Sequence, residues 1–255
     1  MNNTKVSIIM PSYNSMNYIS NSINSVVNQT YENWELIIVD DFSDDNTVSI
    51  IKSFISLDNR IRLIKNTKNR GAAFTRNTAI LESKYSYLAF LDSDDIWVKE
   101  KLEKQLFFMK RNKIAFSFSG FEIIDKNGNL TGKSVDTMQK GAFSYEDMLL
   151  KKATLGCSTV MLNKSKFNGL MKIPSIRTGQ DYAFWLKLLK NTDEKAHVIS
   201  LPLTKYRITP NSISRNKIKK AQRQWFIYRK IEHLSLLKSC YCFCFYAFRA
   251  IVKTK

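Results

Sequence analysis

The amino-acid sequence predicts an α/β protein built on a single mixed, mostly parallel sheet that is flanked by helices. Between about residues 5 and 91, apolar stretches of strand length alternate with segments whose apolar residues recur every three or four positions. This alternation is typical of parallel strands that are joined by helices. Polar or acidic residues follow three of the strands, at 11–14, 40–45 and 92–95. Ligands bind beyond the carboxyl ends of the strands in open parallel sheets, so these loops indicate a binding edge.

The first half of the chain contains the most regular pattern. Pro11 has no amide hydrogen and cannot donate to a sheet ladder, so we expect the first strand to end there. Asp45 or Asn46 is placed to cap the second helix. The strands expected in this half are 5–10, 34–39, 61–64 and 87–91, and the expected helices are 18–27, 47–57 and 72–82.

The second half alternates less regularly, and we expect it to extend the same sheet rather than to form an independent domain. A helix is predicted from about 96 to 111, with Asp95 as its cap. Ser144 and Asp147 resemble a capping box at the start of a short helix. The other elements expected are strands at 114–124, 157–162, 198–201 and 204–208, a hairpin turn at 125–128, and helices at 144–151 and 182–189.

The composition indicates a folded, reduced protein. The chain has 255 residues, of which 44% are hydrophobic, enough for a substantial core. Its four cysteines include a cluster at 240, 242 and 244, a spacing that suits neither a disulfide framework nor a zinc site. The short polar start does not resemble a signal peptide, and no apolar run approaches the roughly 20 residues that span a bilayer. We therefore expect a cytosolic protein.

The C-terminal segment, 216–255, carries much of the net charge of +18. From Arg215 to Lys255 there are eleven lysines and arginines and one acidic residue, Glu232. Aromatic and aliphatic residues lie among these cations, as in a basic amphipathic helix at an anionic membrane surface. Two alternatives remain open. One is a C-terminal helix packed on the core, which can coexist with membrane contact, and the other is a nucleic-acid partner, for which no recognised motif is present.

Three carboxylates, those of Asp92, Asp94 and Asp95, follow the strand at 87–91. An ionised carboxylate is not buried without a partner, so these residues must lie in solvent, meet cations or bind a metal. Asp92 and Asp94 point the same way in extended backbone, which suits a hard divalent cation that keeps open positions for phosphate oxygens. A solvated acidic turn is the alternative, and the polar loops after two other strands at the same edge argue against it.

Four motifs occur in order along the chain: VSIIMPSYN at 6–14, VDDFSDD at 39–45, NRG at 69–71 with RN at 76–77, and LDSDD at 91–95. Together they resemble family 2 glycosyltransferases with the GT-A fold. A further segment, QDYAFWL at 180–186, resembles the Glu-Asp-Tyr-x-x-Trp-Leu segment of that family and extends the match to about residue 215. The resemblance implies a Rossmann-like glycosyltransferase domain over 1–215, with a nucleotide-binding half at 1–100 and an acceptor and catalytic-base half at 101–215. The membrane-associating tail would be 216–255.

The resemblance also implies how the donor is bound. The carboxylate of Asp41 would accept a hydrogen bond from N3–H of the base, which favours uracil. Pro11 and Tyr13 would flank the base, where Tyr13 either stacks on it or packs in the core. Arg76 would either contact a phosphate or lie solvated on its helix. Arg207, in a segment that resembles bacterial polysaccharide members of the family, would reach the diphosphate.

Asp92 and Asp94 match the acidic ends of the Asp-x-Asp motif of the family. This match implies that they hold the Mn²⁺ or Mg²⁺ ion that bridges the donor diphosphate, with Asp94 as the more direct ligand and Asp92 nearer the ribose or the sugar. Asp181 matches the catalytic base, although Gln180 stands where glutamate is common. Alternatively, Asp181 is the N-cap of the helix at 182–189, and the two roles can coexist.

The resemblance implies an inverting, metal-dependent hexosyltransferase. It would transfer glucose or galactose from a UDP-sugar to a lipid-linked saccharide, such as an undecaprenyl-diphosphate oligosaccharide, in bacterial O-antigen, lipopolysaccharide or capsule polysaccharide biosynthesis. We expect it in the cytoplasm, peripheral on the inner face of the plasma membrane, with an anionic membrane surface and no nucleic acid as partner. The alternatives are a catalytically inactive nucleotide-sugar-binding protein and a basic nucleic-acid-binding α/β protein.

Overall fold

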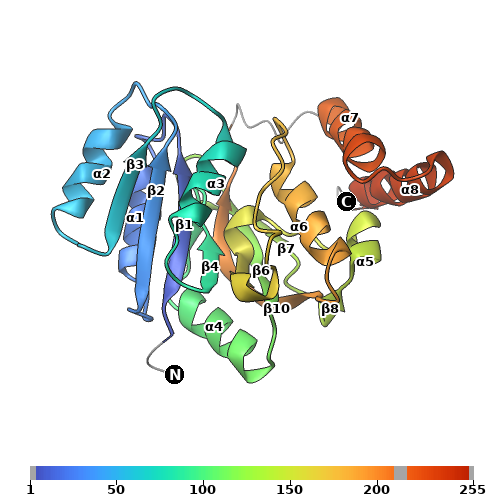
Figure 1. Ribbon diagram of the computed structural model, residues 1–255, viewed down its shortest axis with the longest axis horizontal. Coiled ribbons are helices and arrows are strands. Elements are labelled where there is room, and N and C mark those ends of the chain that lie inside the picture. The colour runs from blue at the N-terminus through green and yellow to red at the C-terminus, as the bar shows by residue number, and fades with distance from the viewer. Residues whose placement is uncertain (1–3, 210–216, 253–255) are drawn as a thin grey trace.

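The computed structural model describes residues 4–209 and 217–252 (Figure 1). Its strands are β1 (Val6–Ser12), β2 (Trp34–Asp40), β3 (Ile61–Lys65), β4 (Tyr87–Phe90), β5 (Ile96–Trp97), β6 (Phe116–Ile124), β7 (Leu130–Val135), β8 (Ala142–Phe143), β9 (Val160–Asn163) and β10 (Ala196–Arg207). Its helices are α1 (Ile19–Val27), α2 (Thr47–Ile55), α3 (Ala72–Leu81), α4 (Lys101–Arg111), α5 (Tyr145–Leu149), α6 (Gln180–Lys190), α7 (Lys217–Phe226) and α8 (Leu236–Val252). The strands form one ten-stranded sheet in the order β3-β2-β1-β4-β9-β6-β10-β5, with β7 beside β6 and β8 beside β10. The predicted α/β class is therefore confirmed.

The first half of the sheet is parallel, as predicted, because β3, β2, β1 and β4 pair side by side in one direction. Every residue of β1 and β2 is buried, which is typical of a parallel sheet covered on both faces. Alternate side chains of β1 enter two separate hydrophobic clusters. Ile9 packs in the cluster that includes α3 and α6, whereas Ile8 and Met10 pack in the cluster that includes α1, α2 and α4.

The first strand is longer than predicted, because β1 continues through Pro11, which is in register with Val39 of β2. Its other neighbour, β4, pairs with β1 only as far as Ile9. At Pro11 the strand therefore has a neighbour on one side only, and a residue without an amide hydrogen is tolerated there as at a sheet edge. As a result, the loop at the binding edge starts at Tyr13.

The second half extends the same sheet, as expected, because β9 runs antiparallel between β4 and β6 and joins the two halves. The predicted strands at 198–201 and 204–208 are one strand, β10, whose pairing with β6 is irregular around Pro202. The predicted strand at 157–162 begins as a 3₁₀ helix, η1 (Cys157–Thr159), and becomes extended only at β9.

Two local predictions in this half are confirmed. The turn at 125–128 joins β6 and β7, which pair antiparallel. Ser144 and Asp147 form the predicted capping box of α5, in which the Ser144 side chain accepts from the Asp147 amide and the Asp147 side chain accepts from the Ser144 amide. Turns and helix caps of this kind can be predicted from the sequence because they depend on neighbouring residues alone.

The prediction that Asp95 caps a helix is wrong. Residues 96–97 form the short strand β5, which pairs with β10, and α4 begins only at Lys101. Asp95 is 1% exposed. Its carboxylate accepts hydrogen bonds from Ser158 Oγ at 2.5 Å and from the Arg207 amide at 2.9 Å. Asp95 thus ties the loop after β4 to η1 and β10.

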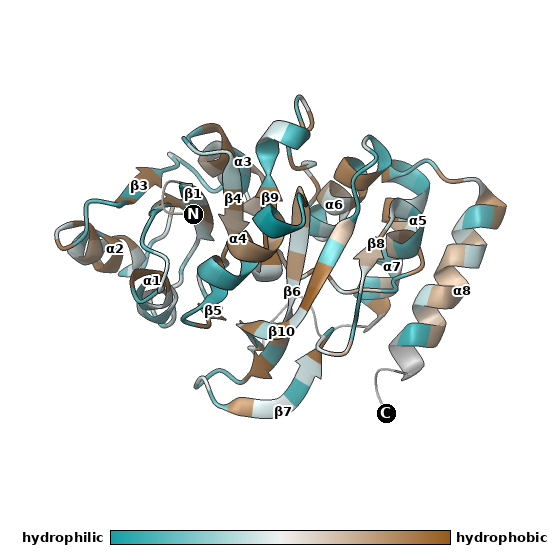
Figure 2. Cartoon of the chain, turned by 90° about the horizontal axis from the view of Figure 1, so that it is seen from below, coloured by the Kyte–Doolittle hydropathy of each residue, from teal (hydrophilic) through white to brown (hydrophobic). Residues whose placement is uncertain are grey.

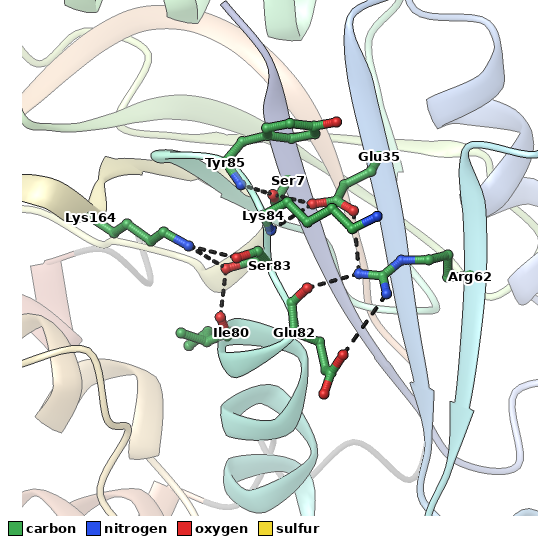
Figure 3. Close-up of polar contacts among 9 residues, drawn as sticks. All are labelled: Ser7, Glu35, Arg62, Ile80, Glu82, Ser83, Lys84, Tyr85 and Lys164. Atoms are coloured by element: carbon green, nitrogen blue, oxygen red, sulfur yellow. Dashed lines mark hydrogen bonds and ion pairs between the residues drawn. The ribbon is translucent and has the colours of Figure 1, made fainter.

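A polar network at the amino ends of the strands fixes the connection between α3 and β4 (Figure 3). The buried carboxylate of Glu35, on β2, accepts from Ser7 Oγ at 2.7 Å, from the Lys84 amide at 2.8 Å and from Arg62 Nη2 at 3.3 Å. Ser7 Oγ in turn accepts from the Tyr85 amide at 3.1 Å. These contacts hold β1, β2, β3 and the α3–β4 loop together at the edge of the sheet opposite the acidic loops.

The C-terminal segment packs on the body of the protein, next to α5 and α6 (Figure 1). A π-helical turn, η4 (Ile227–Ile231), links α7 to the connection before α8. Tyr228 and Cys242 are part of the hydrophobic core, and Tyr228 Oη donates to the Leu149 carbonyl at 2.5 Å. Glu232 is buried between Tyr145 Oη and Lys190 Nζ. The prediction that the C-terminal segment packs on the core is therefore confirmed.

Candidate active site

The carboxyl ends of β1, β2 and β4 meet at one edge of the sheet, where the sequence predicted the donor site. Asp40, at the end of β2, is fully buried and accepts hydrogen bonds from Ser12 Oγ at 3.1 Å and from the Ser43 amide at 2.9 Å. Its carboxylate thereby closes the loop after β2 onto the end of β1. This contact fixes the position of the neighbouring residue, Asp41.

Asp41 organises the turn that leads into α3. It is 3% exposed and accepts from Asn66 Nδ2 at 2.7 Å, from the Arg70 amide at 2.9 Å and from the Gly71 amide at 2.7 Å. Gly71 has a φ of +83°, a conformation that glycine adopts without strain. Because a carboxylate can accept about four hydrogen bonds, these three leave room for one more. The hydrogen bond between Asp41 and a base stays a prediction.

Tyr13 projects from the loop that follows β1. Its side chain is 50% exposed, so the alternative that it packs in the core is wrong. Pro11, two residues before Tyr13 in the chain, is buried within β1. Of these two residues, Tyr13 is the one with an accessible ring face on which a base could stack.

Arg76 and Asp92 form an ion pair at the binding edge. Arg76 Nη2 donates to Asp92 Oδ1 at 2.5 Å, and the arginine is 6% exposed, so the solvated alternative is wrong. Burial lowers the pKa of Arg76, but the carboxylate of Asp92 outweighs that effect and raises it, with a smaller contribution from Asp181. Arg76 is therefore a cation that is held against the carboxylate of Asp92.

Asp94 lies beside Asp92 and carries the shifted pKa expected of a crowded carboxylate. Burial and the neighbouring charge of Asp92 raise the pKa of Asp94 to about 6. A divalent cation that binds between the oxygens of two neighbouring carboxylates offsets the repulsion between them. The pair Asp92 and Asp94 therefore fits a Mg²⁺ or Mn²⁺ ion.

Arg207 is hydrogen-bonded to the backbone of the acidic loop that contains Asp94. It is 3% exposed, and its guanidinium donates to the carbonyl oxygens of Asp94 at 2.7 Å, Asp125 at 3.0 Å and Lys126 at 3.1 Å. It also lies over the ring of Tyr18, 4.7 Å from its centroid. These contacts make Arg207 a positioning residue for the loop, and its predicted contact with a diphosphate stays a prediction.

A cavity of about 650 Å³, which we call the aspartate cavity, opens next to this edge and is lined by both Asp92 and Asp181. Asp181 lies in the first turn of α6, where the helix dipole favours a negative charge. The N-cap of α6 is Gly179, so the alternative that Asp181 is the N-cap is wrong. The fold thus brings together two carboxylates that are separated by almost ninety residues of chain.

Several cations in the wall of the aspartate cavity were missed by the sequence analysis. Lys151 follows α5, and Lys220 and Arg223 belong to α7. The basic composition of the tail predicts contact with a membrane surface and does not indicate a role in this cavity. Lys220 and Arg223 reach the cavity only through packing of α7 on the body, which no local pattern encodes.

An open sheet with paired aspartates at its strand ends, beside a cavity that a further aspartate lines, is the arrangement that the sequence motifs predicted for a GT-A glycosyltransferase. The family model "Glycosyl transferase family 2" matches residues 7–167, more than half of the chain. The protein belongs to this family, as the sequence motifs predicted.

Similar proteins of bacteria are named as glycosyltransferases. The chain is 43% identical over 248 residues to the putative teichuronic acid biosynthesis glycosyltransferase TuaG of Bacillus subtilis, covering 97% of this chain and 96% of TuaG. It is 43% identical over 225 residues to WfgD of Escherichia coli, covering 88% of this chain and 85% of WfgD. WfgD is named a UDP-Glc:α-D-GlcNAc-diphosphoundecaprenol β-1,3-glucosyltransferase.

Solved structures share the fold. The crystal structure of S. aureus TarS residues 1–349 in complex with UDP-GlcNAc superposes with a TM-score of 0.72 at 21% identity, covering 89% of this chain and 65% of that one. The same TarS fragment in complex with UDP superposes with a TM-score of 0.71 at 19% identity, covering 94% of this chain and 70% of that one. At these identities the comparison establishes the GT-A fold alone.

Proposed function

We propose that this protein is an inverting glycosyltransferase that transfers glucose from UDP-glucose to a saccharide linked through a diphosphate to a polyprenyl lipid. The observation that carries the proposal is the aspartate cavity, in which Asp92, at the donor edge, and Asp181 line one space. The names of WfgD and of WfaP of Escherichia coli, which is 37% identical over 250 residues, favour glucose and a diphosphoundecaprenol acceptor. The similarity to TuaG favours a role in bacterial surface polysaccharide assembly.

In this proposal, the residues at the donor edge bind the metal ion and the nucleotide or hold the binding groups in place. Asp94 and Asp92 would hold a Mn²⁺ or Mg²⁺ ion, which supplies positive charge to the departing diphosphate when it is bound. Arg76 holds the Asp92 carboxylate in place through their 2.5 Å contact. Asp41 keeps the turn before α3 in shape, and Tyr13 offers its exposed ring to the base.

The proposed reaction is a single displacement. An acceptor hydroxyl oxygen forms a bond to the anomeric carbon while the bond between that carbon and the diphosphate oxygen breaks. The hydroxyl proton passes to the carboxylate of Asp181, and UDP leaves. Attack from the face opposite the diphosphate inverts the configuration of the anomeric carbon.

A panel of nucleotide sugars tests the proposal. The purified protein is incubated with UDP-glucose, UDP-galactose, UDP-GlcNAc or GDP-mannose, with a GlcNAc-diphosphate-lipid acceptor, and with or without Mn²⁺ or Mg²⁺. We expect product with UDP-glucose only when a divalent cation is present, and NMR should show inverted anomeric configuration. Binding of UDP without transfer from any donor would favour the catalytically inactive alternative and refute the proposal.

We also propose that α8 attaches the protein to an anionic membrane surface. One face of α8 packs on the body through Ser239 and Cys242. The opposite face is exposed and mostly apolar from Leu237 to Phe248. Figure 2 shows α8 along one side of the molecule, largely in the hydrophobic colours. The residues of this apolar stripe recur every three or four positions: Leu237, Cys240, Tyr241, Cys244, Phe245 and Phe248. Within the described ranges, no helix is long and apolar enough to cross a bilayer.

Replacing Leu237 and Phe248 by glutamate should weaken binding to vesicles that contain phosphatidylglycerol by at least about tenfold, because burial of each side chain in the interface is worth on the order of 2 kcal/mol. Co-sedimentation with the vesicles measures the effect. The matched control replaces Leu57 and Leu81, which are 85% and 84% exposed elsewhere on the surface, by glutamate. Equal binding by the α8 variant and the control would rule out α8 as the attachment surface.

A further inference from the structure

We infer that Lys220 and Arg223 of α7 bind the diphosphate of the lipid-linked acceptor, so that the tail helix forms the acceptor subsite. This inference rests on the proposed function and extends it to residues outside the family motifs. It starts from where α7 lies. Both side chains line the aspartate cavity together with Asp181.

The Arg223 side chain of α7 closely approaches the loop before Asp181. Gly179, the N-cap of α6, has a φ of +75°, and a Cβ atom at this position would lie 2.9 Å from Arg223 Cδ and 3.1 Å from Ile227 Cδ1. Any other residue would be strained at this φ, and the side chains of Arg223 and Ile227 would have to shift to make room for its Cβ atom. Arg223 therefore lies against the N-cap of α6, and this N-cap precedes the candidate base, Asp181, by two residues.

A second cavity of about 740 Å³, which we call the basic pocket, shares Lys220 and Arg223 with the aspartate cavity. Arg177 and Lys219 add two further cations to its wall. The two shared side chains therefore stand between the space that holds Asp181 and an open, strongly basic space. Such a cluster suits a ligand with several negative charges, because arginine and lysine bind phosphate oxygens through charge-assisted hydrogen bonds.

Apolar groups in the same wall indicate that the anion belongs to a lipid. Ile176 and Phe226 line the basic pocket, and Phe226 is 46% exposed. A diphosphate that is joined to a sugar on one side and to an isoprenoid chain on the other needs cations in the middle, a cavity with carboxylate or amide groups for the sugar, and an apolar surface for the chain. The aspartate cavity, the pair Lys220 and Arg223, and the side chains of Ile176 and Phe226 provide these three parts.

Gln224 supplies a further donor at this place. It is 2% exposed, lies on α7 next to Arg223 and lines the aspartate cavity. Its side chain lies within hydrogen-bonding reach of the hydroxyl groups of Tyr182 and Tyr228. The amide can also donate to an oxygen of an acceptor that is bound in the cavity.

The test compares three water-soluble acceptors that carry the same sugar: an alkyl diphosphate, an alkyl monophosphate and a neutral alkyl glycoside. With UDP-glucose as donor, we expect the double variant Lys220→Met/Arg223→Met to lose about a hundredfold or more in kcat/KM for the diphosphate, since a hydrogen bond to a charged group contributes about 1.5–3 kcal/mol. The loss should be smaller for the monophosphate and absent for the neutral glycoside, and the KM for UDP-glucose should not change.

Two controls accompany the double variant. Arg223→Lys keeps the charge and should recover part of the activity toward the diphosphate. Lys104→Met removes a charge from the exposed face of α4 and should behave as wild type with all three acceptors. An equal loss with every acceptor, or no loss with the diphosphate, would overturn the inference while leaving the proposed function standing. No transfer by the wild type to any acceptor would refute the proposed function, and this inference with it.

Discussion

Replacing Asp181 by asparagine should reduce sugar transfer by about 10²–10⁴-fold while leaving UDP binding unchanged. Asparagine has nearly the same shape as aspartate but cannot take the proton of the acceptor hydroxyl, and general-base catalysis is worth a factor of this size. The residue lies in the first turn of α6 and lines the cavity next to the donor edge, not at the edge itself. The effect should therefore appear in kcat rather than in the affinity for the nucleotide.

Single-turnover transfer and titration of UDP separate these two quantities. Asp193→Asn is the matched control, because Asp193 is an exposed carboxylate shortly after the end of α6 and lies outside the residues that line the cavity. Transfer at the wild-type rate by the Asp181 variant would refute the assignment of the base.

Replacing Trp185 by alanine should lower the free energy of unfolding by about 3–5 kcal/mol, as is typical of removing a large aromatic side chain from a core. Trp185 is 1% exposed and makes edge contacts with Phe90 and Phe116, whose ring centroids lie 5.4 and 5.5 Å from its own. Through these contacts it attaches α6, which carries Asp181, to β4 and β6. Urea unfolding followed by circular dichroism measures the loss.

Trp185→Phe is the control for this change. Phenylalanine keeps most of the aromatic contact area and removes the indole nitrogen, which is buried without a hydrogen-bond partner among the described residues. The Trp185→Phe variant should lose about half as much free energy of unfolding as the Trp185→Ala variant, or less. A loss of under 1 kcal/mol for the alanine variant would show that the attachment of α6 does not depend on Trp185.

The parallel half of the fold and the residues of the donor edge could be predicted from the sequence, because both depend on local patterns. The apolar runs of β1 and β2 and the helical spacing of α1 and α2 identify those elements without knowledge of their partners. The acidic residues follow β2 and β4 directly, so the rule that parallel strands align their carboxyl ends was sufficient to bring Asp41 and Asp92 to one edge.

The features that could not be predicted depend on contacts between segments that are distant in sequence. The two-residue strand β5 exists only because it pairs with β10, and without that pairing Asp95 looks like a helix cap. The spacing of Arg76 and Asp92 does not show that they form an ion pair, since this requires α3 to lie against the end of β4. In the same way, the cations of α7 resemble a surface-binding tail until the packing of α7 against Gly179 is known.

The close contact between Gly179 and α7 has a consequence for how such enzymes can be engineered. A tail that only attached the protein to a membrane could be deleted, or exchanged between relatives, without touching the reaction. Here the segment that carries the apolar stripe of α8 begins with the helix that closes the wall around Asp181. If α7 forms the acceptor subsite and α8 the membrane surface, as proposed, a chimera with a tail from a relative should change both the acceptor preference and the membrane binding of the enzyme.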